Sequence, residues 1–134
     1  MDSSAAYPAM FLAKARQALS EARAITAINL PEAAGRAAYL AAFHAAQALI
    51  FARTSKIART HSGVRSEFAR LAKLEAGLDR DLSAFLAQAY NLKSIADYAI
   101  GSEGGVDLNE AQEAIAGAAH FIEAVARVLN GETQ

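Results

Sequence analysis

The sequence predicts an all-α protein with one core, and two observations carry that prediction. Alanine supplies much of the 54% hydrophobic content, and the 134 residues include only two prolines and eight glycines, a composition that favours helices. Apolar side chains also recur every three or four residues, which is the spacing of one helix face. A chain of this length can bury one core, so residues 1–134 are expected to form a single domain.

Two long helices are expected in the first part of the chain. The first runs from Tyr7 or Pro8 to Ile28, because proline suits the first turn, where its missing N–H costs nothing. The second runs from about Pro31 to Arg53 and is apolar around most of its circumference. Such a helix is normally covered on more than one side, so the second helix should be central.

A short third helix and a longer fourth helix follow. Ser62 is expected to cap the third helix, which continues to about Leu74 and is closed by Gly77. The fourth is predicted from about Asp79 to Ile100. Its inward-facing residues are expected to be Leu82, Phe85, Ala89, Leu92 and Ala96.

The last helix is predicted to begin after Asp107, because Asp107 and Glu110 match a capping box, in which each side chain bonds the other residue's backbone N–H. Three glycines separate it from the fourth helix: Gly101, Gly104 and Gly105. Its inward-facing residues are expected to be Leu108, Ala111, Ile115, Ala118, Ile122, Val125 and Leu129.

Charge is distributed unevenly along the chain, although the net charge is only −1. Between Arg53 and Arg80 there are seven basic residues and three acids, whereas from Asp97 to the last residue there are seven acids and one arginine. The small net charge argues against a general binder of polyanions. The basic middle of the chain is therefore the segment in which an anion site is expected.

Several classes of site are excluded by residue type and spacing. The chain has no cysteine, so it has no disulfide and no thiolate, which favours a cytoplasmic location. No apolar run of about 18 residues and no signal-peptide pattern occurs, so no membrane association is expected. Neither a metal nor another cofactor is expected, because His44, His61 and His120 lack a ligand spacing and residues 101–106 lack the lysine of a phosphate loop. His44 is instead expected to be a hydrogen-bonded histidine in the core or at a subunit contact.

The turn between the second and third helices carries the candidate site. Arg53, Arg59, His61 and Arg65 lie in or beside it, and the backbone N–H groups at the start of the next helix also favour an anion. Arginines there would hold a phosphate of RNA or of a nucleotide in bidentate fashion. In a nuclease, His61 would act as the general acid or base.

Two alternatives to a phosphate site apply to the same turn. A serine hydrolase would use Ser62 with His61, but neighbours in sequence do not provide triad geometry, and capping explains the serine. The second alternative is a solvated turn whose arginines pair with Glu67 or Glu75.

Three segments together resemble the HEPN domain family, in its stand-alone bacterial and archaeal branch. They are Ala38–Ile50 (AYLAAFHAAQALI), Arg59–Val64 (RTHSGV) and Ala96–Tyr98 (ADY), and their order extends the resemblance over nearly the whole chain. The resemblance implies an up-and-down bundle of four to five helices that forms a homodimer. It also implies a partner, a minimal nucleotidyltransferase, in a two-gene toxin–antitoxin module.

Many proteins of this family are metal-independent ribonucleases built on an Arg-x(4–6)-His motif, from which this sequence departs. Seven residues separate Arg53 from His61, and one residue separates Arg59 from His61. Phosphate recognition by Arg59, His61 and Arg65 is therefore predicted in place of cleavage. A metal-independent ribonuclease toxin, using His61 with Arg53 or Arg59, is one alternative, and a scaffold dimer without a ligand is another.

Overall fold

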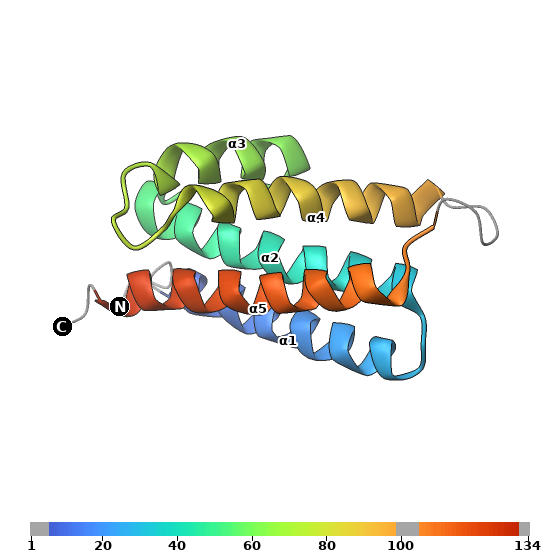
Figure 1. Ribbon diagram of the computed structural model, residues 1–134. Helices are drawn as coiled ribbons and strands as arrows, with labels where there is room; N and C mark the ends of the chain where they lie inside the picture. The colour runs from blue at the N-terminus through green and yellow to red at the C-terminus, as the bar shows by residue number, and fades with distance from the viewer. Residues whose placement is uncertain (1–5, 99–104, 132–134) are drawn as a thin grey trace.

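The computed structural model describes residues 6–98 and 105–131, and these residues form five α-helices and no strand (Figure 1). The helices are α1 (Tyr7–Ala27), α2 (Pro31–Thr54), α3 (His61–Ala72), α4 (Arg80–Tyr98) and α5 (Leu108–Gly131). The predicted all-α class and the five predicted helices are confirmed. None of the helices within these residues is long and apolar enough to cross a membrane.

The central helix is α2, as its sequence predicts. It contacts each of the other four helices, with α1 and α5 on one side and α3 and α4 on the other (Figure 1). Apolar side chains surround most of α2. Each Å² of this apolar surface that stayed in water would reduce the stability of the fold by about 25 cal/mol. Four neighbouring helices together provide the cover that one neighbour could not.

The core contains many alanines and a few large side chains between them. Phe68 of α3 and Phe121 of α5 are fully buried, and their ring centroids are 4.8 Å apart. Tyr39, Leu49 and Ile50 of α2 are also buried. The alanines allow the helices to approach closely, so the large side chains fill the space where three helices meet.

For α5 and α3, the predicted N-terminal cap can be compared with the observed one. The capping box is confirmed: the Glu110 N–H donates to Asp107 Oδ1 at 2.8 Å, and the Asp107 N–H donates to Glu110 Oε1 at 3.0 Å. The predicted cap of α3 is wrong by two residues, because Thr60 Oγ1, not Ser62, accepts from the Gly63 N–H at 2.9 Å. Thr60 has the extended backbone of an N-cap (φ −86°, ψ 150°), whereas Ser62 already lies inside the helix.

The predicted helix ends agree with the observed ends to within two residues wherever the structure describes them. The helix α3 ends at Ala72 rather than near Leu74, and α4 begins at Arg80 rather than Asp79. Three residues named in the predictions fall outside the described part of the chain: Ile100, Gly101 and Gly104.

The inner face of α4 differs from the predicted one. Three of its five predicted residues are buried: Leu82, Ala89 and Ala96. Phe85 and Leu92 are only half-buried, because they border a hollow between α4 and α5. Leu86 is buried instead. The inner face therefore turns toward α2, which α4 contacts much more widely than it contacts α5.

The predicted inner face of α5 is correct except near its ends. Five of the seven predicted residues are buried: Ala111, Ile115, Ala118, Ile122 and Val125. Leu108 is exposed and Leu129 is half-buried. Both lie in the terminal turns of the helix, where fewer neighbouring helices cover the surface.

Candidate functional site

His61 is the first residue of α3, and its ring packs against α2 and α4. Its Nδ1 lies 2.8 Å from the hydroxyl oxygen of Tyr39 in α2. The centroid of the His61 ring is 5.5 Å from that of Tyr39, 5.4 Å from that of Phe43 and 5.2 Å from that of Tyr90 in α4. The start of α3 is thus held by aromatic side chains from two other helices.

Two cations lie beside these rings. Arg65, one turn after His61, places its Cζ 4.1 Å from the centroid of the Tyr90 ring, within the range of a cation–π interaction. Lys93 Nζ lies 5.8 Å from the same centroid and 2.7 Å from Asp97 Oδ2. Five side chains are called the His61 cluster: Tyr39, His61, Arg65, Tyr90 and Lys93.

The polar groups of Arg65 are incompletely paired. Its Nη1 is buried and has no hydrogen-bond partner among the described residues. Arg65 also forms no ion pair with any carboxylate in the described part of the chain. Buried charged donors normally have a partner, so this guanidinium requires an explanation.

The protonation of the cluster follows from burial and from its cations. Burial lowers the pKa of His61 most, and the charges of Lys93 and Arg65 lower it further, while Asp97 opposes them. Burial raises the pKa of Tyr39 to about 12, although the Arg65 guanidinium beside its hydroxyl partly offsets that rise. At neutral pH the imidazole is therefore uncharged, and the Tyr39 hydroxyl keeps its proton.

Of the remaining two predicted site residues, the structure separates Arg53 from His61. Arg53 lies fourteen residues after Tyr39 on α2, which is about 21 Å of helix rise. Its Nε forms an ion pair with Glu75 Oε1. Arg59 is exposed in the turn before α3. The structure thus brings His61 and Arg65 together, and it places Arg53 near the far end of α2.

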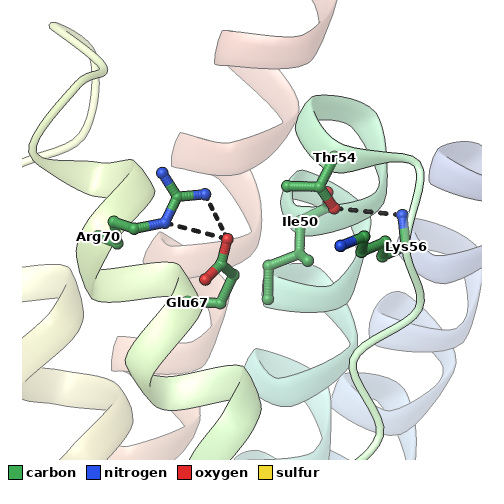
Figure 2. Close-up of polar contacts among 5 residues, drawn as sticks. All are labelled: Ile50, Thr54, Lys56, Glu67 and Arg70. Atoms are coloured by element: carbon green, nitrogen blue, oxygen red, sulfur yellow. Dashed lines mark hydrogen bonds and ion pairs between the residues drawn. The ribbon is translucent and has the colours of Figure 1, made fainter.

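The opposite side of α3 borders a second hollow, of about 390 Å³. Figure 2 shows Glu67 and Arg70 of α3 on one wall of this hollow and Thr54 and Lys56 on the other, with Ile50 between them. Arg70 donates to Glu67 through both Nε and Nη2. Because the Arg70 charge is engaged in this pair, it adds little positive potential to the surface.

The predicted pairing of arginines with glutamates therefore applies to part of the basic segment. It is confirmed for Arg53, which pairs with Glu75, whereas Glu67 pairs with Arg70, an arginine outside the turn. Arg59 and Arg65 form no such pair within the described residues. The solvated-turn alternative thus explains Arg53 and leaves Arg59 and Arg65 unexplained.

Three members of the His61 cluster are not predicted as site residues from the sequence: Tyr39, Tyr90 and Lys93. One signal for Tyr39 is its position in a buried, alanine-rich helix, where a tyrosine hydroxyl needs a partner. Tyr90 and Lys93 are three residues apart and therefore share one face of α4. That face cannot be linked to His61 without knowing how α3 and α4 pack.

His44 belongs to a separate hydrogen-bonded chain. Its Nδ1 lies 2.8 Å from Gln47 Oε1, and Gln47 Nε2 donates to the Ala58 carbonyl oxygen at 2.8 Å. The prediction that His44 is hydrogen-bonded is confirmed. Through buried Gln47, this chain holds the loop that leads to His61 against α2. Nowhere in the described residues do three or more potential ligand side chains gather as a metal site would require.

A family model described as HEPN domain matches residues 9–128, a range that includes every member of the His61 cluster and nearly all of the five helices. No curated protein matches the chain.

Proposed function

The chain belongs to the HEPN domain family, and from this premise we propose that its His61 cluster binds a phosphate group of RNA or of a nucleotide. The single observation that carries the proposal is the state of Arg65. Arg65 is half-buried and has no carboxylate partner among the described residues, so its guanidinium suits a ligand that brings negative charge and acceptor oxygens. Phosphate provides both.

The arrangement of the neighbours supports the same ligand. The Tyr90 ring holds the Arg65 guanidinium in place, which reduces the entropy that would be lost when a ligand binds. Lys93 forms an ion pair with Asp97, which offsets its charge, but its ammonium has three N–H donors and can share them with a ligand. Arg59 is exposed just before α3, and we propose that it meets the next phosphate of a longer strand.

We favour recognition over cleavage because the groups that a nuclease would need are not gathered around His61. Arg53, the arginine nearest to the motif spacing, is paired with Glu75 and lies near the far end of α2. Tyr39, the group hydrogen-bonded to the His61 ring, has a pKa of about 12 and does not exchange a proton readily near neutrality.

The proposed setting follows from the family resemblance. We propose that the protein forms a homodimer and acts beside a minimal nucleotidyltransferase in a toxin–antitoxin module. Co-expression with the product of the adjacent gene, followed by affinity purification and mass measurement, tests both claims. A protein that elutes alone and as a monomer would count against this setting, while leaving the phosphate site to its own test.

The phosphate site is tested by titrating the protein with a short fluorescent single-stranded RNA at low salt, in excess chelator. Arg65→Gln should weaken binding about tenfold or more, since hydrogen bonds to charged groups contribute about 1.5–3 kcal/mol. The matched control is Arg70→Gln, on the same helix but paired with Glu67 on its opposite side. Equal affinities for wild type and Arg65→Gln would exclude the site, and RNA cleavage that His61→Ala abolishes would favour the ribonuclease.

A further inference from the structure

We propose that Tyr39 is a positioning residue that holds His61 in the tautomer with its proton on Nε2, so that His61 presents a hydrogen-bond donor to the ligand beside the donors of Arg65 and Lys93. The proposal rests on the surroundings of the Tyr39 hydroxyl group. Tyr39 is fully buried, and its hydroxyl lies 2.8 Å from His61 Nδ1, its hydrogen-bond partner among the described residues.

The assignment follows from counting protons around this hydroxyl. A tyrosine hydroxyl has one proton to donate, and a buried donor is costly to leave without an acceptor. The Tyr39 proton must then point to His61 Nδ1, the acceptor beside it. If Nδ1 carried the proton, His61 would donate to the Tyr39 oxygen, and the buried Tyr39 proton would lack an acceptor among the described residues.

The groups that face His61 favour the neutral ring for the same reason. An imidazolium would carry protons on both nitrogens, and one of them would point at the Tyr39 hydroxyl. The cations beside the ring are Arg65 on α3 and Lys93 on α4, and Asp97 on α4 is the acid that opposes them. From α2 the ring meets Tyr39 and the uncharged ring of Phe43, and from α4 it also meets Tyr90.

The consequence concerns the chemistry of the ligand, and it rests on the proposed phosphate site. With its proton on Nε2, His61 offers an N–H donor beside the donors of Arg65 and Lys93. A ligand must then supply acceptor oxygens and negative charge, as a phosphate does, and a ligand group that donates a hydrogen bond is disfavoured. In this tautomer Nε2 cannot accept a proton from a ribose hydroxyl, so His61 recognises the phosphate and is not a general base.

Nitrogen-15 NMR of the histidine side chains tests the assignment on the free protein. In wild type, His61 should show a protonated, pyrrole-type Nε2 and an unprotonated, pyridine-type Nδ1 at neutral pH. Tyr39→Phe removes the hydroxyl that fixes this state, so a protonated Nδ1 should become populated. Tyr90→Phe is the control, because it keeps a ring against His61 and leaves the bond between Tyr39 and Nδ1 in place.

The wild-type spectrum alone can overturn the tautomer assignment, so the test remains informative even if the Tyr39→Phe variant unfolds. A protonated Nδ1 in wild type, or identical tautomer populations in wild type and folded Tyr39→Phe, would overturn the inference. The measurement needs no RNA, so its outcome is separate from that of the titration with Arg65→Gln. RNA binding with a protonated Nδ1 would retain the phosphate site and remove the role of Tyr39.

Discussion

The hydroxyl of Tyr39, in the middle of α2, lies 2.8 Å from Nδ1 of His61, the residue that begins α3. Twenty-two residues separate the two along the chain. This bond joins the core to the candidate site, because Tyr39 is fully buried and His61 is not. The burial that stabilises the bundle therefore also fixes the orientation of the histidine.

Tyr39→Phe is expected to lower the free energy of unfolding by about 1 kcal/mol, the usual contribution of one hydrogen bond. The substitution keeps the ring and its packing, so the change reports on the hydroxyl alone. Urea denaturation followed by circular dichroism provides the measurement. Tyr98→Phe is the matched control, because Tyr98 is 82% exposed and its change should stay within about 0.5 kcal/mol. Equal losses for the two variants would contradict the prediction.

Stability is expected to fall as the pH drops below the ordinary histidine pKa of 6.5, because folding lowers the pKa of His61. Between the folded-state pKa and 6.5, the unfolded chain binds more protons than the folded chain. The free energy of unfolding thus rises with pH through this window, and the His61 contribution is constant above it.

This dependence is measured as the difference between wild type and His61→Gln in urea denaturation at a series of pH values. The difference isolates His61 from the other titrating groups, which both proteins share. Two curves that run parallel through the window would show that folding leaves the pKa of His61 unchanged.

The fold was accessible from the sequence because its determinants are local. The apolar spacing of each helix, the proline at the start of α2 and the capping box of Asp107 and Glu110 all lie within single elements. Apart from the cap of α3, which lies at Thr60 and not at Ser62, errors occurred where a neighbouring element decides which side chains are buried. Leu86 is buried in place of Phe85 because α4 turns toward α2, and periodicity along α4 alone does not reveal that.

The candidate site was only partly accessible for the same reason. His61 and Arg65 lie one turn apart on one helix, so their sequence spacing already places them together. Tyr39 and Tyr90 reach them from α2 and α4 through packing between helices, which no spacing encodes. Arg53 is close to His61 in sequence but distant in the fold, because it remains on α2 while the loop carries His61 back toward Tyr39.

The N-cap of α3 predicts that Gly63→Ala destabilises the wild-type protein but stabilises the Thr60→Ala variant. An added Cβ on Gly63 would lie 2.5 Å from Thr60 Oγ1, so Gly63→Ala should open the cap and cost about 1 kcal/mol. In a Thr60→Ala background that oxygen is absent, and Gly63→Ala should instead stabilise the helix by about 0.5–1 kcal/mol. A double-mutant cycle of urea denaturation curves measures both steps. Equal effects of Gly63→Ala in the two backgrounds would contradict the clash.

Arg53→Gln is expected to reduce stability and to leave RNA affinity unchanged. The side chains of Arg53 and Glu75 are only 18% and 19% exposed, and removing one partner leaves a partly buried charge, at a cost of about 1–3 kcal/mol. Urea denaturation and the RNA titration are performed on the same preparation. Loss of RNA binding at unchanged stability would contradict the structural role, and it would favour the ribonuclease that uses Arg53 with His61.

Gly117→Ala is expected to destabilise the protein, although alanine is the better helix former. An added Cβ would lie 2.2 Å from Cε1 of Phe85, which is a steric clash. The Phe85 ring would have to move within the hollow between α4 and α5 to remove this clash. Such overpacking costs about 1–3 kcal/mol, which exceeds the gain of about 1 kcal/mol in helix propensity. Phe85→Leu in the Gly117→Ala background shortens the side chain and should recover part of the loss in thermal or urea denaturation. A Gly117→Ala protein more stable than wild type would show that helix propensity decides at this position and that Phe85 yields without cost.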